Sequence, residues 1–299
     1  MKAECVVDCR CVLGEGIIWD AESGVLWWVD IPLPKPRIHC WNPQTGEHRS
    51  WDMPEMVGSI AVRENGTLLV ASHYGLNSFD PQTGALTRLS EPEKHLPQNR
   101  ANDGKCDPQG RFWFGTMQNN VAPDGSDLPI DQNSGVLYRV ESDLSVHPVV
   151  TDVAISNSLC WSTDERTLYF SDTVSGWIEA FDFEPQAGTV SNRRQFAYAE
   201  GQGYPDGATT DDAGGVWSCR WEGSCVIRFD ASGKIDCVVE VPVERVTCAV
   251  FGGPNLDTLY ITTSTQNMTP EEFEAEPQSG GIYAVQPGFR GVATPRFRE

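Results

Sequence analysis

The sequence predicts an all-β protein built as a six-bladed β-propeller. A strand, a turn and an aromatic strand recur roughly every 40 to 55 residues, the period expected of propeller blades. Helical periodicity is scarce along the 299 residues. The turns over 42–46 and 80–84 are also nearly identical, reading Asn-Pro-Gln-Thr-Gly and Asp-Pro-Gln-Thr-Gly. Six units of about four strands make one propeller, which we expect to form a single domain over residues 1–299.

The second strand of each unit is the most visible, because it combines aromatic and β-branched residues between turn signals. We expect it at 24–30, 66–71, 110–115, 166–171, 215–219 and 257–262. A third strand of similar composition should follow at 37–41, 75–79, 135–139, 177–181, 225–229 and 281–285. Turns rich in Asp, Asn, Pro and Gly precede the second strands, so each unit consists of strands joined by short connections.

The N-terminal stretch and two long connections depart from the repeat. A strand around 4–11 precedes the first complete unit, and we expect it to close the ring by joining the last blade, which ends near Arg296. Residues 118–133 in the third blade and 266–279 in the sixth lengthen the spacing. In the second stretch Thr269 precedes Pro270, which is typical of a helix start. A helical turn is therefore expected over one rim.

The net charge and the cysteine content indicate which classes of partner and which cellular environment to expect. The net charge is −20, from 42 acidic and 22 basic residues. Such a surface repels nucleic-acid phosphates and anionic lipid headgroups, so we expect neither nucleic acid nor membrane as a partner. There is no apolar run of ~18 residues and no apolar N-terminal signal segment. The 10 cysteines are expected as free thiols in a reducing cytoplasm, and the 5 histidines, which share no spacing, as packing residues.

Polar turns lie at equivalent places, each opening the first strand of its unit. They contain Glu15 in the first unit, Asn102 and Asp103 in the third, Asn157 in the fourth and Asp206 in the fifth. Because the innermost strands of a propeller line one channel, these side chains should meet at one mouth. Carboxylate and amide oxygens suit Ca²⁺, Mg²⁺ or Mn²⁺, and an open site with waters could also accept Zn²⁺. The alternative is a set of ordinary Asp, Asn and Gly loops.

Six motifs occur in a fixed order along the chain. They are Leu13-Gly14-Glu15-Gly16, Asn99-Arg100-Ala101-Asn102-Asp103-Gly104, Gly115-Thr116-Met117, Ile155-Ser156-Asn157, Tyr204-Pro205-Asp206-Gly207 and Phe251-Gly252-Gly253-Pro254-Asn255. Together they resemble the motifs of the SMP-30/gluconolactonase/luciferin-regenerating-enzyme family, over nearly the whole chain. The resemblance implies a six-bladed propeller with one divalent cation. Ca²⁺ is the expected ion, with Zn²⁺, Mg²⁺, Mn²⁺ or Fe²⁺ as alternatives.

The resemblance also implies residue roles. Glu15, Asn157 and Asp206 match the family's metal ligands, and Asp206 also matches the proposed general base. Arg100 and Asn102 match positions that contact substrate. Asn120 is a further expected substrate contact, in a place where some members have an acidic residue. One departure is that Asn157 is followed by Ser158, where the family usually has Gly.

The function that the resemblance implies is hydrolysis of a sugar (aldono-)lactone to the aldonic acid, by metal-assisted attack of water on the lactone carbonyl. The expected partner is this small molecule, and the expected assembly is a monomer or a weak homo-oligomer. Two alternatives stay open. One is a promiscuous metal-dependent esterase or phosphotriesterase, and the other is a calcium-binding or scaffolding propeller without catalysis.

Overall fold

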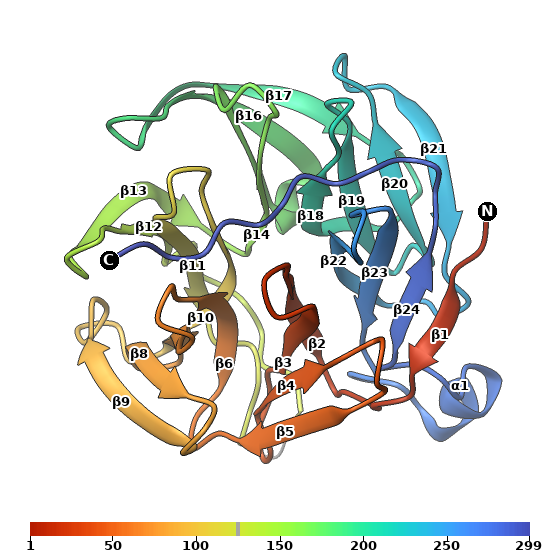
Figure 1. Ribbon diagram of the computed structural model, residues 1–299, viewed down its shortest axis with the longest axis horizontal. Coiled ribbons are helices and arrows are strands. Elements are labelled where there is room, and N and C mark those ends of the chain that lie inside the picture. Colours follow the sequence, from red (N-terminus) through yellow and green to blue (C-terminus); the bar gives the residue numbers. More distant parts are fainter. Residues whose placement is uncertain (124–125) are drawn as a thin grey trace.

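The protein folds as a ring of six four-stranded antiparallel sheets, so the predicted six-bladed β-propeller is confirmed (Figure 1). The computed structural model describes residues 1–123 and 126–299. Blade one comprises β2 (Gly14–Asp20), β3 (Val25–Asp30), β4 (Arg37–Trp41) and β5 (His48–Asp52). Blade two comprises β6 (Val57–Val62), β7 (Leu68–Ser72), β8 (Gly75–Asp80) and β9 (Ala85–Ser90). Blade three comprises β10 (Asn99–Cys106), β11 (Phe112–Gln118), β12 (Gly135–Val140) and β13 (Val146–Val153).

The second half of the ring repeats this pattern and then closes it. Blade four comprises β14 (Ser156–Trp161), β15 (Thr167–Asp172), β16 (Trp177–Glu184) and β17 (Thr189–Tyr198). Blade five comprises β18 (Tyr204–Thr210), β19 (Val216–Trp221), β20 (Cys225–Phe229) and β21 (Ile235–Glu240). Blade six comprises β22 (Val246–Gly252), β23 (Thr258–Thr263), β24 (Ile282–Val285) and the N-terminal strand β1 (Glu4–Val7). β1 pairs antiparallel with β24, which confirms closure by the N-terminal strand. That strand is shorter than predicted and ends at Val7.

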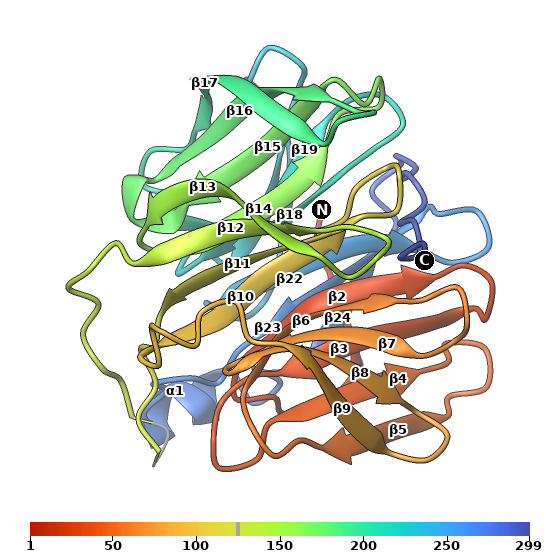
Figure 2. The ribbon, with the colours of Figure 1, turned by 90° about the vertical axis from the view of Figure 1, so that its left-hand side faces the viewer.

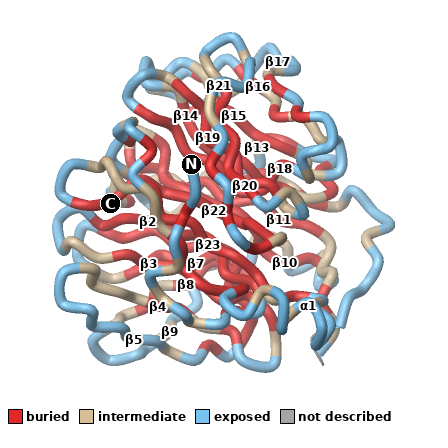
Figure 3. The backbone as a smooth tube through the Cα atoms, turned by 90° about the vertical axis from the view of Figure 1, so that its right-hand side faces the viewer, coloured by how far each residue is buried: buried red, intermediate tan, exposed pale blue. Residues whose placement is uncertain are grey.

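Burial falls from the channel outward, as Figure 3 shows for the strands and the loops at their ends. β2, β6, β14 and β22 are buried at every residue, whereas β5 and β9 have no fully buried residue. The second strands carry the largest buried side chains, including Trp28, Trp113 and Trp217. These rings fill the wedge-shaped space between blades, and their burial explains why the second strand is the clearest repeat in the sequence.

Every innermost strand contains an irregularity in its pairing with the second strand. The register shifts lie between Glu15 and Ile18, Val57 and Ser59, Ala101 and Gly104, Asn157 and Cys160, Pro205 and Ala208, and Val246 and Ala249. A β-bulge bends its strand and redirects the adjacent side chain. Five of the predicted site residues therefore lie within the innermost strands, near their bulges, and not in the turns before them: Glu15, Arg100, Asn102, Asn157 and Asp206.

The connections contain little helix. α1 (Pro270–Ala275) begins with a capping box, in which the Glu272 N–H donates to Thr269 Oγ1 at 3.2 Å and the Thr269 N–H donates to Glu272 Oε2 at 2.8 Å. The predicted helical turn is thus confirmed. Among the described residues, no helix has both the length and the apolar character needed to cross a membrane. Figure 2 shows α1 at the end of the propeller opposite the C-terminus.

The C-terminal segment 286–299 crosses the end of the ring opposite α1 (Figures 1 and 2). The Gly291 N–H donates to Leu256 O in blade six, the Phe297 N–H to Val62 O in blade two, and the Arg298 N–H to Gly110 O in blade three. The expectation that the last blade continues to Arg296 is therefore wrong. Blade six ends at β24 and β1, and the tail instead connects several blades.

Candidate functional site

One cavity of about 280 Å³ opens at the end of the channel where the innermost strands begin. The six residues that were assigned site roles line it: Glu15, Arg100, Asn102, Asn120, Asn157 and Asp206. Asp103, also expected at this mouth, is not among the lining residues; its Oδ2 accepts from the Leu159 N–H at 3.1 Å. Five of the six lining residues come from the innermost strands of blades one, three, four and five, and Asn120 follows β11. The ring brings together residues up to about 190 positions apart, because equivalent strands surround one axis.

Two carboxylates at the floor of this cavity are nearly excluded from solvent. Glu15 is 5% exposed and Asp206 is 6% exposed. Burial raises the pKa of Glu15, and the neighbouring Asp103 raises it further. Burial likewise raises the pKa of Asp206, with further contributions from Glu15 and Asp103. A concentration of buried negative charge of this kind becomes favourable when a cation neutralises it.

The side-chain amides next to these carboxylates are held in defined orientations. Asn102 Nδ2 donates to Asn157 Oδ1 at 3.1 Å and to the Ser156 carbonyl at 3.0 Å. Asn157 Nδ2 donates to Thr173 Oγ1 at 2.8 Å, and Thr173 Oγ1 donates to the Pro205 carbonyl at 2.9 Å. Because Thr173 takes the Nδ2 side of Asn157, the oxygen of that amide lies on the side of Asn102, whose Nδ2 donates to it. The oxygen donors of Glu15, Asn157 and Asp206 form a set that fits a hard divalent cation.

Arg100 is a buried cation of the site, which Arg245 also lines. Its Nη1 donates to Asn102 Oδ1 at 2.8 Å and to the Ala101 carbonyl at 2.9 Å, and its Nη2 donates to Asn120 Oδ1 at 2.9 Å. Burial lowers the pKa of Arg100 to about 10, against the opposing effect of Glu15 and Asp206. The guanidinium therefore stays charged at neutral pH. Asn120 contacts the cavity and also fixes one side of this guanidinium.

Sequence analysis did not identify two features of the site. Thr173 lies in a 3₁₀ turn, η1 (Thr173–Ser175), after the second strand of blade four, where the repeat pattern carries no polar signal. The rim contains Asp127, whose carboxylate accepts from Gln266 Nε2 at 3.1 Å and from Asn267 Nδ2 at 2.6 Å. The two long stretches noted in the sequence, 118–133 and 266–279, thus meet across the mouth of the cavity.

Comparison with known proteins shows the family to which the chain belongs. The model of the SMP-30/gluconolactonase/LRE-like region matches residues 13–265. The chain belongs to this family. It is 36% identical over 296 residues to a 6-deoxy-6-sulfogluconolactonase of Pseudomonas putida, covering 98% of both chains. It is 34% identical over 300 residues to regucalcin of Xenopus laevis, covering 99% of this chain and 98% of that one.

Solved structures of the SMP-30/gluconolactonase family share the fold over the full ring. A calcium-binding protein, regucalcin, from Agrobacterium tumefaciens superimposes with a TM-score of 0.91 at 29% identity, covering 100% of this chain and 98% of that chain. A luciferin-regenerating enzyme superimposes with a TM-score of 0.89 at 27% identity, covering 99% of each.

The departure from the family pattern at Ser158 has a structural explanation. Ser158 has a φ of 59°, a left-handed conformation that glycine adopts at lower cost. Its hydroxyl is fully buried and donates to the Asp206 carbonyl at 2.6 Å. The serine therefore connects the innermost strands of blades four and five directly behind two of the predicted ligands, an attachment that glycine cannot provide.

Proposed function

We propose that this protein is a metal-dependent lactonase that hydrolyses a sugar (aldono-)lactone to the aldonic acid. The observation that carries the proposal is the meeting of Glu15, Asn157 and Asp206 with Arg100 and Asn102 in one buried cavity. Its volume of about 280 Å³ suits a small molecule. The Pseudomonas putida relative, named for a gluconolactonase activity, supports a lactone as the substrate class.

Glu15, Asn157 and Asp206 would hold the cation, because they supply oxygen donors with two formal negative charges. Ca²⁺ is the first candidate, in keeping with the calcium-binding description of the Agrobacterium regucalcin, and Zn²⁺, Mg²⁺, Mn²⁺ and Fe²⁺ are the alternatives. When bound there, a divalent cation supplies positive charge that polarises the lactone carbonyl and stabilises the developing oxyanion.

The side chains of the site have separate roles in the proposed reaction. Asp206 accepts a proton from the water that attacks the carbonyl carbon, and returns it to the ring oxygen as the ring C–O bond breaks. Arg100 and Asn102 orient the lactone by donating to its oxygens. Within the described part of the chain, Arg100 Nε is buried and has no hydrogen-bond partner. Asn120 keeps the guanidinium in place.

Hydrolysis of a panel of aldonolactones in a pH-stat, with the uncatalysed rate subtracted, tests the proposal. We expect turnover of one or two lactones, its loss in EDTA, and its recovery with one of the candidate cations. Asp206→Asn should reduce kcat/KM by at least about 100-fold. The exposed Asp212→Asn, in the next turn of the same blade, is the matched control and should keep full activity.

Two results would contradict the proposal. If Asp206→Asn bound the cation normally and retained full lactonase activity, the role of Asp206 would be wrong. If the wild-type protein bound the cation but opened no lactone, a calcium-binding propeller without catalysis would be the better description. A parallel panel of simple esters and phosphotriesters distinguishes a promiscuous hydrolase.

A further inference from the structure

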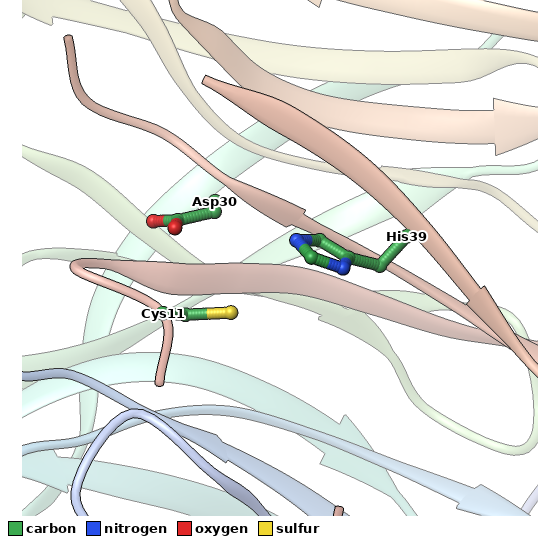
Figure 4. Close-up of side chains that lie close together, drawn as sticks. All are labelled: Cys11, Asp30 and His39. Carbon is green, nitrogen blue, oxygen red and sulfur yellow. The ribbon is translucent and has the colours of Figure 1, made fainter. Parts of the chain in front are cut away.

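A second group of metal-binding side chains lies outside the channel, in blade one. Figure 4 shows Cys11, Asp30 and His39 converging from the β1–β2 connection, the end of β3 and the middle of β4. One potential ligand atom from each lies within 4.8 Å of the others. All three residues are buried, with exposures of 1%, 7% and 4%. None of them lines the cavity of the proposed lactonase site.

His39 has the arrangement of a metal-binding histidine. Its Nδ1 lies 3.1 Å from His48 Nε2, and its ring stacks on Trp28 with a centroid distance of 5.0 Å and an angle of 4°. Among the described residues, the buried Nε2 of His39 has no hydrogen-bond partner. Metal-binding histidines use one ring nitrogen as ligand while the other is fixed by a hydrogen bond. A buried nitrogen without a partner otherwise carries a desolvation cost.

Cys9 is a further donor beside Cys11, outside the group of three. Its thiol donates to the Gly280 carbonyl at 3.2 Å, a hydrogen bond that it would exchange for the ion. The two sulfurs are 3.6 Å apart. Two thiolates on one tetrahedral Zn²⁺ are separated by about 3.8 Å, because each Zn–S bond is about 2.3 Å long. Cys9 is half-buried and therefore connects the buried group with solvent. The Leu13 N–H donates to Asp30 Oδ1 at 2.9 Å, which holds the carboxylate next to the cysteine segment.

We propose that Cys9, Cys11, Asp30 and His39 bind one Zn²⁺ ion. Two sulfurs, one imidazole nitrogen and one carboxylate oxygen form a borderline-soft ligand set, which favours Zn²⁺ over the Ca²⁺ or Mg²⁺ that oxygen-only sites prefer. On binding, each thiol releases its proton to solvent, and the hydrogen bond from Cys9 to the Gly280 carbonyl is lost; the two S–H bonds are the covalent bonds that break. The ion would fasten the β1–β2 connection, which follows the strand that closes the ring, to β3 and β4 of blade one.

Co²⁺ binding to reduced, metal-free protein tests this site separately from the channel. The titration uses an Asp206→Asn background, in which the channel ligands are incomplete. We expect one equivalent of Co²⁺ to bind with a thiolate-to-cobalt charge-transfer absorption and with release of about two protons, and one equivalent of Zn²⁺ to displace it without further proton release. Zn²⁺ should also raise the melting temperature. The absorption should be lost in Cys11→Ser and His39→Gln and retained in Cys237→Ser, another half-buried free thiol.

A Co²⁺ spectrum without the thiolate band, or a band that persists in both Cys11→Ser and His39→Gln, would overturn the proposal. If Cys11→Ser does not fold, Cys9→Ser decides the question, since Cys9 is half-buried and its loss leaves no internal cavity. That variant should weaken Zn²⁺ binding at least about 10-fold. Unchanged Zn²⁺ affinity in folded Cys9→Ser and His39→Gln proteins would mean that the group only packs blade one.

Discussion

At the scale of single residues, Thr173 decides how Asn157 presents its amide. Its hydroxyl accepts from Asn157 Nδ2 and donates to the Pro205 carbonyl, immediately before Asp206. Thr173→Val keeps the shape of the side chain but removes both hydrogen bonds, so the Nδ2 side of the Asn157 amide loses its partner while Oδ1 keeps the bond from Asn102. Because outer ligand partners of this kind typically contribute 10- to 100-fold to metal affinity or activity, we expect a loss of about 10-fold.

Thr173→Ser is the matched control, because it retains the hydroxyl. Cation affinity by isothermal titration calorimetry and kcat/KM for the best lactone should both fall in Thr173→Val and remain close to wild type in Thr173→Ser. A Thr173→Val protein with normal cation affinity would show that Asn157 is oriented by other contacts.

At the scale of the blade, a buried Asp stabilises the turn after the innermost strand. In blade five, Asp211 accepts from Trp217 Nε1 at 2.7 Å and from Arg228 Nε at 2.6 Å. In blade three, Asp107 accepts from Trp113 Nε1 at 2.9 Å. The spacing from Asp to Trp is the same in both blades, so this Asp–Trp hydrogen bond is a repeated feature of the fold.

Asp211→Asn should destabilise the protein by about 3 kcal/mol, because it removes the buried one of the two carboxylates that pair with the Arg228 guanidinium and leaves the more exposed Asp236. Burial alone would raise the pKa of Asp211, but hydrogen bonds from Arg228, Gly215 and Trp217 outweigh it and lower the pKa. A lowered carboxyl pKa stabilises the fold above the unfolded value of about 3.9. That contribution is lost as pH falls through the folded value.

Urea denaturation at a series of pH values measures this effect. The difference in unfolding free energy between wild type and Asp211→Asn should be largest at neutral pH and decrease as the pH falls below about 5. Asp212→Asn, at an exposed position beside it, should match wild type at every pH. A difference that did not change with pH would exclude the ionised carboxylate as the cause.

At the scale of the whole molecule, the C-terminal segment binds blades together at the end opposite the site. Phe297 is 0% exposed and belongs to a hydrophobic cluster with side chains of blades two and three. Phe297→Ala should therefore cost about 3–5 kcal/mol of stability through the cavity that it leaves. We expect kcat/KM to be unchanged below the melting temperature, since the tail lies far from the channel mouth.

Thermal unfolding followed by circular dichroism checks this expectation. Val292→Ala, at an exposed position of the same segment, should have a melting temperature close to that of wild type. If Phe297→Ala and Val292→Ala lowered the melting temperature equally, the tail would not act as part of the core.

From the sequence repeat we could predict the ring, and also that residues at equivalent positions meet in one site. Equivalent positions such as Glu15 and Asp206 must converge once six similar units surround one axis, whatever their separation in the sequence. Thr173 and the pairing of Asn120 with Arg100 could not be predicted in this way. They depend on side-chain directions in connections that differ from blade to blade.

The sequence by itself determined the six-bladed propeller and the meeting of Glu15, Asn102, Asn157 and Asp206 at one mouth, because these follow from periodicity. Closure by the N-terminal strand was predicted from the strand that precedes the first unit, and the places of Arg100 and Asn120 from the family resemblance. The tertiary structure alone decided where the tail 286–299 lies and that Cys11, Asp30 and His39 form one buried group. The physical reason is that these contacts join segments outside the repeat. Their geometry is set by packing and hydrogen bonding in the closed ring, and no local pattern in the chain encodes it.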